Sequence, residues 1–478
     1  MKNNTLPVSW NGLAKTLVVL GIVALDLILG MLANSIVLVV LVGVAGAGAV
    51  FFALNRRIEI GLLLMVLASF FGRWNIGTGS NVPINLTILL LAYLLAFWLL
   101  RSVVSKEFKL LPSRVNLPAL IFVLFVTVST IAGSIPWIPL AAARASLEAQ
   151  LGGWLMFIFS IGAFLYIGNN TGDMVWLKRL TWLFVIVGTI FLTMQTIRPL
   201  KDLSPLIFVS GFDLGSNYWQ WAAAFATAEL LFDRKLNLVG KLFLVEAIGV
   251  IFYIGWFNNR EWVSGWLPPM VAVFAIIWLR SWKLGAVVSA IAGVYLLLNF
   301  QGLTASVMSD TQQYSLFSRE ATWPIMLQLI KASPILGLGP SNYYHYTPLF
   351  PILGWSVKFN SHNNYVDIIA ETGLLGMAAF VWLIAEIGFL GLRLKNRVNS
   401  NFGQVYVNFA LGGMAAMLVS GFLGDWFIPF VYNISTSGFR FSIFNWLFLG
   451  GLIVLDHFDP GRTKVLYDST TAFNKMGE

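Results

Sequence analysis

Long apolar runs recur along almost the whole chain, and they limit the possible folds more than any other feature of the sequence. A helix needs about 20 apolar residues to cross the hydrocarbon core of a bilayer. By that criterion we expect fourteen spans, at residues 16–34, 36–54, 58–72, 83–100, 117–133, 150–168, 177–195, 217–232, 241–257, 262–279, 284–299, 372–392, 405–424 and 438–455. Some runs are short and separated by tight turns, so a count of twelve or thirteen stays open. The sequence therefore predicts an all-α, polytopic membrane protein with about 12–14 transmembrane helices.

The composition agrees with a membrane protein and excludes several kinds of chemistry. Hydrophobic residues make up 58% of the chain and charged residues 11%, whereas soluble domains carry about 25% charged residues. The chain has no cysteine, which excludes disulfides, thiol catalysis and cysteine metal sites. The sequence has no Walker A loop, and no His, Asp and Glu cluster with metal-ligand spacing falls on the predicted external face. We therefore expect no cofactor and no metal.

The distribution of basic residues predicts the orientation of the spans. Cytoplasmic loops carry an excess of Lys and Arg, and a cytoplasmic N-terminus places 21 of the 30 basic residues on that side. The other nine are then external: Arg73, Arg144, Arg198, Lys201, Arg260, Arg319, Lys331, Lys358 and Arg440. The net charge of +9 is therefore interpreted as a topology signal. Its partner is the lipid bilayer with its anionic headgroups, and no nucleic acid is expected.

One connection is much longer than the others. Residues 300–371 form a predicted external loop, and loops of that length are usually functional when they are ordered. Within it we expect a short helix that is capped by Thr322 and ends at Lys331, and we expect Ser361 to cap a helix that begins with Asn363. The loop divides the chain into three parts: an N-terminal transmembrane bundle of about 11 helices at 1–299, an external catalytic loop at 300–371, and C-terminal transmembrane helices with a cytoplasmic tail at 372–478.

The three histidines of the chain are candidates for acid–base chemistry, because the histidine side chain titrates near neutral pH. His457 follows the last span on the predicted cytoplasmic side, whereas His345 and His362 lie in the large loop. A histidine in such a loop is most often a solvated or interfacial residue. His362 stands out because it comes at the start of a helix. The spacing to Asp367 and Glu371 does not by itself place either carboxylate on the same helical face as His362.

Two arginines on the predicted external side are candidates for binding phosphate. Arg260 lies in the sequence FNNREW, a very short turn between two apolar helices, and Arg319 lies in the large loop. The ordinary interpretation is contact with lipid headgroups for Arg260, and a salt bridge with Glu320 or another acidic residue of the loop for Arg319. The functional interpretation is a clamp on a diphosphate, because a guanidinium offers a planar fork of donors to phosphate oxygens.

The loop and the span after it resemble the O-antigen ligase and O-antigen polymerase superfamily, over roughly residues 255–390. The pattern is an Arg and a Trp ahead of an amphipathic helix, then a Pro, a G-x-G, an aromatic-rich stretch, H-N and E-x-G-x-x-G. The residues that carry it are Arg319, Trp323, Pro334, Gly337, Gly339, His362, Asn363, Glu371, Gly373 and Gly376. One departure concerns Arg260, which is followed by Glu and Trp where the family often has S-R-G.

The resemblance implies a type C-like glycosyltransferase fold with its active site on the periplasmic face of the bacterial cytoplasmic (inner) membrane. It implies an undecaprenyl-diphosphate glycan as donor, without metal or nucleotide sugar. Arg260 and Arg319 would bind the donor diphosphate. His362 would deprotonate the acceptor hydroxyl, which attacks the anomeric carbon and inverts it. Supporting roles would fall to Asn363, Glu371 and Trp323.

The resemblance leaves the acceptor open. A ligase, as in lipopolysaccharide biosynthesis, transfers the glycan to a lipid A core oligosaccharide or to a protein. A polymerase of O-antigen or exopolysaccharide transfers it to another lipid-linked repeat unit. Both reactions need the same base and the same diphosphate clamp, and we favour the ligase slightly. The alternative from another class is a polytopic transporter of an anion or a lipid-linked sugar, in which the loop acts as a gate.

Overall fold

The computed structural model describes residues 57, 59–73, 75–76, 84–106, 110–138, 144–209, 215–302, 310–352 and 354–458, with the backbone alone at 76, 215–216 and 310–319. The expected spans 16–34 and 36–54 lie outside the described residues. By contacts between residues the chain divides into Met1–Ile60 and Gly61–Glu478. The packing described below is within the second of these units.

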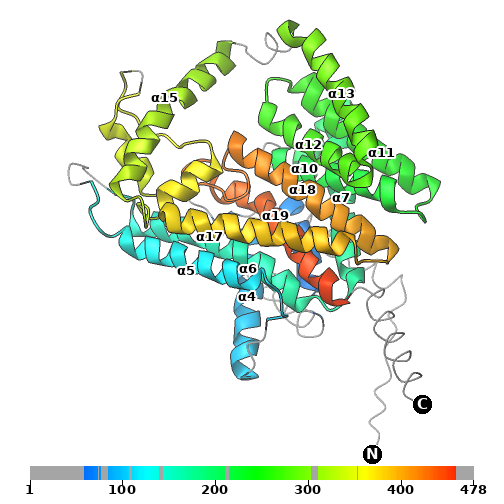
Figure 1. Ribbon diagram of the computed structural model, residues 1–478, viewed down its shortest axis with the longest axis horizontal. Coiled ribbons are helices and arrows are strands. Elements are labelled where there is room, and N and C mark those ends of the chain that lie inside the picture. Colours follow the sequence, from blue (N-terminus) through cyan, green and yellow to red (C-terminus); the bar gives the residue numbers. More distant parts are fainter. Residues whose placement is uncertain are drawn as a thin grey trace, which may run out of the picture. The chain divides into compact units, whose positions relative to one another are not determined.

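Every expected span from residue 58 onward coincides with a helix of the structure (Figure 1). These helices are α3 (Ile60–Phe71), α4 (Leu86–Val104), α5 (Asn116–Ala132), α6 (Leu147–Asn170), α7 (Met174–Thr196), α10 (Gly215–Phe232), α11 (Leu238–Phe252) continued by the π-helical turn η2 (Tyr253–Asn258), α12 (Val263–Arg280), α13 (Trp282–Leu298), α17 (Asn364–Lys395), α18 (Asn401–Leu423) and α19 (Ser435–Phe458). In the part of the chain that the structure describes, 8 helices are long and apolar enough to cross a membrane. The prediction of an all-α, polytopic membrane protein is confirmed.

The remaining elements are short or lie outside the expected spans. They are α8 (Arg198–Lys201), α9 (Ser204–Ile207), α15 (Asp310–Ala332), α16 (Tyr343–Tyr346), the 3₁₀ turn η3 (Thr347–Leu349), and the strands β1 (Asn75–Ile76) and β2 (Ile84–Asn85). The two strands pair antiparallel over two residues each. Extended structure in the described residues is therefore confined to connections between helices, including an isolated bridge between Ile352 and Trp355.

Helix α19 lies at the centre of the bundle. Every residue in its most apolar 18-residue stretch is buried by other parts of the chain. It packs against α6 and α18. Glycine allows the backbones of α19 and α6 to approach closely, because a Cβ on Gly450 would lie 2.3 Å from the carbonyl oxygen of Phe164. A helix that is hydrophobic on all sides is expected to be enclosed in this way.

A buried polar network connects α10 and α19 to the 424–434 segment, which joins α18 to α19. The Asn445 side chain accepts hydrogen bonds from Gln220 Nε2 at 2.8 Å and from Trp221 Nε1 at 2.6 Å. It donates to Asn217 Oδ1 at 3.0 Å, and Asn217 in turn donates to the carbonyl oxygen of Trp426 at 2.9 Å. Because buried amides are costly unless they are hydrogen-bonded, these bonds hold the 424–434 segment against the helices.

The helix in the large loop differs from the prediction. Instead of starting at Thr322, α15 runs from Asp310 to Ala332 and contains Pro324 in its interior. A proline inside a helix removes one backbone hydrogen bond and costs about 3 kcal/mol. In α15 this cost is offset by packing, because Met326 and Leu329 are buried one turn later in a cluster with residues of α17 and the 424–434 segment. Thr322 is therefore an interior residue of the helix.

Candidate active site at the start of helix α17

The residues before α17 form a tight turn that is fixed by side-chain hydrogen bonds. Asn363 is the N-cap, and its Oδ1 accepts from the backbone N–H groups of Tyr365 and Val366. The prediction that Ser361 caps this helix is therefore wrong. Ser361 lies two residues earlier, where its Oγ accepts from the N–H of Asn363 at 3.1 Å. Ser, Thr and Asn all suit such local bonds, so the sequence alone did not decide between the two caps.

His362 lies between these two buried polar residues and is itself exposed. Its backbone has φ of +49°, in the left-handed region. A residue other than glycine is uncommon there, although histidine is enriched. With this backbone conformation, the side chains of Ser361 and Asn363 on either side are buried, whereas the side chain of His362 is exposed at the surface of the turn.

A buried carboxylate holds the turn from the inside. Asp367 Oδ1 accepts from Ser361 Oγ at 2.6 Å and from the hydroxyl of Tyr343 at 2.5 Å. The Tyr343 hydroxyl also accepts from the backbone N–H of Ser361 at 3.2 Å. Burial and the nearby carboxylate of Asp367 raise the pKa of Tyr343 well above its usual value, so this hydroxyl stays protonated as a donor. The residue before His362 is thus bonded through both its backbone and its side chain.

Glu371 anchors the 334–342 turn, which follows α15. Its Oε1 accepts from the backbone N–H of Ser341 at 2.6 Å, and its carbonyl oxygen accepts from the N–H of Gly339 at 3.0 Å. The hydroxyl of Ser129 in α5 donates to the same carbonyl oxygen. Glu371 therefore acts here on the backbone of a neighbouring turn, whereas His362 precedes the N-cap of α17 and shares no helical face with it.

The glycines of the sequence motif are explained by a kink in α17. Gly373 has φ of +68° and ψ of −170°, and Gly337 and Gly339 in the 334–342 turn also have positive φ. A Cβ on Gly373 would lie 2.2 Å from the carbonyl oxygen of Ile335, and one on Gly337 would lie 2.4 Å from that of Glu371. Only glycine combines this backbone conformation with so close an approach. The two segments therefore meet backbone to backbone.

Four backbone hydrogen bonds join the two segments at the kink. The N–H groups of Leu338 and Gly339 donate to the carbonyl oxygens of Ala370 and Glu371, and those of Leu374 and Leu375 donate to Pro334 and Ile335, at 2.8–3.3 Å. The 334–342 turn thus supplies partners for α17 backbone groups that the kink separates from their own helix.

The same turn fixes the ends of two more helices. Asn342 donates through Nδ2 to the carbonyl oxygen of Gly133 at 3.2 Å and accepts from the N–H of Ala145 at 3.1 Å. The Ser341 hydroxyl donates to the carbonyl oxygen of Ala149 at 2.9 Å. Helix α5 ends just before Gly133 and α6 begins just before Ala149. Figure 1 shows α5 running beside α17, with which it packs.

The 424–434 segment contacts the start of α17 as well, which the sequence did not predict. Asn364 donates to the carbonyl oxygen of Ile428 at 2.6 Å and accepts from the N–H of Phe427 at 3.0 Å. Asp425 is buried and accepts from the N–H of Phe430 at 2.8 Å and from Asn433 at 2.6 Å. Burial raises the pKa of Asp425. A carboxylate directly after a long apolar span, in the sequence GDWF, was the available signal for this residue.

The turn that carries Arg260 is connected to the same segment by aromatic contacts. Trp262 packs against Trp426 at 5.9 Å between ring centroids and against Trp219 at 5.4 Å. The turn follows the π-helical η2, a local distortion that is frequent at functional sites. The 424–434 segment therefore contacts the Arg260 turn through Trp262 and the start of α17 through Asn364, two residues after His362.

The Arg260 side chain is partly buried and lies over the ring of Trp256, with 4.5 Å from the guanidinium carbon to the ring centroid. Its backbone carbonyl accepts from Trp266 Nε1 at 2.8 Å. Its Nε is buried and has no hydrogen-bond partner among the described residues. A buried donor without a partner is costly, so this nitrogen is a candidate to bind an acceptor from outside the chain.

The other two predicted residues of the site lie on α15. Arg319 is part of this helix, but its side chain lies outside the described residues. Trp323 is 63% exposed, whereas Ile325, Met326 and Leu329 of the same helix are buried against α17 and the 424–434 segment. The C-terminal half of α15 is therefore fixed beside the start of α17, with the side chain of Trp323 exposed.

His345 is the second histidine near the site. Its Nε2 is 3.0 Å from the hydroxyl of Tyr432, and Tyr344 stacks on Tyr432 at 4.6 Å between centroids. Burial lowers the pKa of His345, and the positive charge of Lys358 lowers it further. The imidazole is therefore neutral at neutral pH and serves to connect α16 with the 424–434 segment.

Comparison with known families gives one match. Residues 240–381 match the family model described as O-antigen ligase, a range that contains the Arg260 turn, α15, the 334–342 turn and the first half of α17. The match confirms the resemblance to the O-antigen ligase-like family, and it supports a membrane glycosyltransferase of the O-antigen ligase or polymerase type. A search of curated proteins finds no match.

Proposed function

We propose that this O-antigen ligase-like protein transfers a glycan from undecaprenyl diphosphate to an acceptor hydroxyl at the periplasmic face of the bacterial inner membrane. The observation that carries the proposal is the conformation of the turn before α17. A single exposed histidine, His362, is held there in a left-handed conformation between two buried residues whose side chains are fixed by hydrogen bonds. A general base must be positioned within hydrogen-bond reach of the proton that it removes, and a rigid turn provides such a position.

In the proposed reaction His362 accepts the proton of the acceptor hydroxyl. The acceptor oxygen forms a bond to the anomeric carbon of the donor sugar while the bond from that carbon to the diphosphate oxygen breaks. Undecaprenyl diphosphate leaves with the bonding electron pair, and the anomeric carbon is inverted. The negative charge that develops on the leaving oxygen needs cationic partners, and no further reactant is needed.

Arg260 and Arg319 are proposed to bind the leaving diphosphate. Support for Arg260 comes from its buried Nε, which has no hydrogen-bond partner in the described part of the chain, and from the π-helical turn before it. For Arg319 the support is the position of α15, which packs beside the start of α17. Trp323, exposed on the same helix, is proposed to stack on a sugar ring of the donor. Asn363 is proposed to support the site by fixing the backbone just after His362, and Glu371 by anchoring the 334–342 turn that packs against α17.

The test is transfer by the purified full-length protein with a synthetic undecaprenyl-diphosphate oligosaccharide. His362→Ala is expected to lower turnover by about 10²–10⁴-fold, the usual contribution of a general base, while donor binding is retained. His457→Ala is the matched control, because this histidine lies at the far end of α19 and, among the described residues, is hydrogen-bonded to the carbonyl oxygen of Ile453. Transfer by His362→Ala at the rate of the unchanged protein would contradict the proposed role.

The same assay decides the acceptor. Product on an added lipid A core acceptor would indicate a ligase, which we propose as the first possibility, and ladders from donor alone would indicate a polymerase. Uptake of the donor into vesicles without any transfer would indicate the transporter alternative, and would contradict the proposed enzymatic function.

A further inference from the structure

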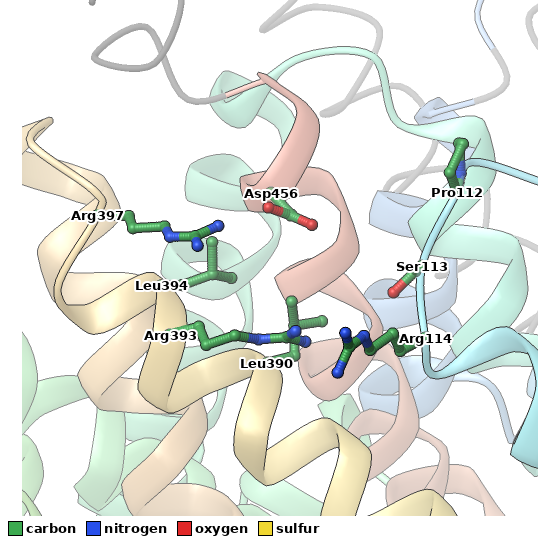
Figure 2. A pocket seen from close by; sticks show the side chains of 8 residues that line it. All are labelled: Pro112, Ser113, Arg114, Leu390, Arg393, Leu394, Arg397 and Asp456. Carbon is green, nitrogen blue, oxygen red and sulfur yellow. The ribbon is translucent and has the colours of Figure 1, made fainter.

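A small cavity lies at the other end of α17 from His362 (Figure 2). It has a volume of about 130 Å³, and three arginines line it. Arg114 precedes α5, whereas Arg393 and Arg397 lie in the last turn of α17 and just after it. Figure 2 shows the side chains of Arg114 and Arg393 pointing toward each other from opposite walls, with Asp456 of α19 above them. All three arginines fall in segments that the charge distribution predicts to be cytoplasmic.

The charge of the cavity favours an anion. Asp456 is the one carboxylate among the residues that line it, so it can neutralise only one of three guanidinium groups. Guanidinium groups that face each other repel, and an anion placed between them removes the repulsion. Phosphate suits this position best, because the planar fork of an arginine matches two phosphate oxygens.

Two further features of the α5 end supply hydrogen-bond donors. The Ser113 hydroxyl, which lines the cavity, is buried and has no hydrogen-bond partner among the described residues. Helix α5 begins at Asn116, and its N-cap residue Val115 provides no side-chain cap. The positive end of a helix dipole favours an anion nearby. An oxyanion in the cavity would therefore satisfy a hydroxyl that is otherwise unpaired.

A larger hollow adjoins the cavity and bears on what kind of molecule could carry the anion. It has a volume of about 500 Å³, shares Arg114 and Arg393 with the cavity, and continues along α17 past Phe389 and Leu392, with Glu386 and Asn396 completing its lining. These two apolar side chains are 59% and 48% exposed. A free phosphate ion would use only the polar cavity, whereas a lipid would place its headgroup there and its acyl chain along the apolar side chains. Basic pockets between membrane helices are suited to such headgroups.

We propose that this cavity binds the phosphate of an anionic lipid headgroup, with the acyl chain lying against Phe389 and Leu392. The proposal is independent of the transfer reaction, because the cavity lies at the C-terminal end of α17 whereas His362 precedes its N-terminal end. Arginines at helix ends ordinarily reach headgroups one by one. Here three arginines from two separate parts of the chain line a single cavity, together with a buried hydroxyl that has no partner within the described ranges.

The test measures lipid binding to the full-length protein by native mass spectrometry, with phosphatidylglycerol, phosphatidylcholine and inorganic phosphate as separate probes. Phosphatidylglycerol is expected to bind more tightly than the other two. In Arg114→Gln/Arg393→Gln its apparent affinity is expected to fall about tenfold or more, because charge-assisted hydrogen bonds are lost. Ser113→Ala keeps all the charges and is expected to reduce affinity by a smaller factor. Arg101→Gln, an exposed arginine on α4, is the matched control.

Three results would overturn the proposal. The first is equal binding of phosphatidylglycerol and phosphatidylcholine by the unchanged protein. The second is an equal loss of affinity in Arg101→Gln, which would indicate unspecific charge attraction. The third is binding of inorganic phosphate as tight as that of phosphatidylglycerol, which would contradict the lipid assignment. Thermal unfolding of each variant in phosphatidylcholine separates lost binding from lost folding, and Ser113→Ala keeps the test decisive if the double variant does not fold.

Discussion

Replacement of Gly373 by alanine tests whether the kink of α17 is the structural basis of the glycine motif. The new Cβ would lie 2.2 Å from the carbonyl oxygen and 2.4 Å from the carbonyl carbon of Ile335, and 2.5 Å from the backbone nitrogen of Gly337. All three are backbone atoms, so no flexible side chain can move away. The φ of +68° and ψ of −170° are also essentially restricted to glycine. Alanine at this position must therefore separate the two segments.

The expected loss of stability follows from two contributions. The backbone conformation costs about 1–3 kcal/mol for a residue other than glycine. Separation of the segments also breaks the hydrogen bonds that Leu374 and Leu375 donate to Pro334 and Ile335, at 2.8 and 3.3 Å, and each contributes about 1 kcal/mol. We therefore expect Gly373→Ala to lower the free energy of unfolding by about 3–5 kcal/mol.

The measurement is thermal unfolding of the purified protein in detergent, followed by the transfer assay. Gly172→Ala is the matched control, because a Cβ at that position meets no atom within 4 Å and is expected to change stability by no more than about 0.5 kcal/mol. An unfolding temperature and a transfer rate of Gly373→Ala equal to those of the control would refute the reasoning.

Three further predictions concern the contacts around the site. Asn364→Leu is expected to destabilise the protein by about 2–4 kcal/mol, because it leaves two buried backbone groups of the 424–434 segment unpaired; thermal unfolding checks this, and an unchanged midpoint would contradict it. Tyr343→Phe removes one hydrogen-bond donor to the buried Asp367, and we expect it to lower the free energy of unfolding by about 1–3 kcal/mol. It is also expected to lower turnover more than donor affinity, and unchanged turnover in the transfer assay would contradict this prediction. The pKa of His345 is lowered by burial, so the folded state binds fewer protons than the unfolded state, and stability is expected to fall as the pH drops below about 6.5. His345→Gln is expected to reduce this loss of stability when thermal unfolding is measured between pH 8 and 5. A variant whose stability changes with pH in the same way as that of the unchanged protein would refute the prediction.

The sequence predicted those parts of the structure that depend on residues close together along the chain. The spans from residue 58 onward were found because a membrane helix requires a continuous apolar run, and each such run is a helix in the structure. Where local signals competed, the prediction failed. Thr322 with Pro324 predicted a helix start, but α15 begins at Asp310 because packing of its later residues outweighs the proline. Ser361 and Asn363 were both suitable caps, and the structure uses Asn363.

The sequence by itself determined that the chain is an all-α membrane protein, and it singled out the motif around His362. Only the tertiary structure decided what the motif residues contact. Asp367 is bonded to Tyr343 and Ser361, Asn364 to the 424–434 segment, and the glycines of two distant stretches meet at one kink. Spacing along a helix cannot predict such contacts, because they join residues that are far apart in the chain and depend on how whole helices pack. The same holds for the arginine cavity, where residues about 280 positions apart share one pocket.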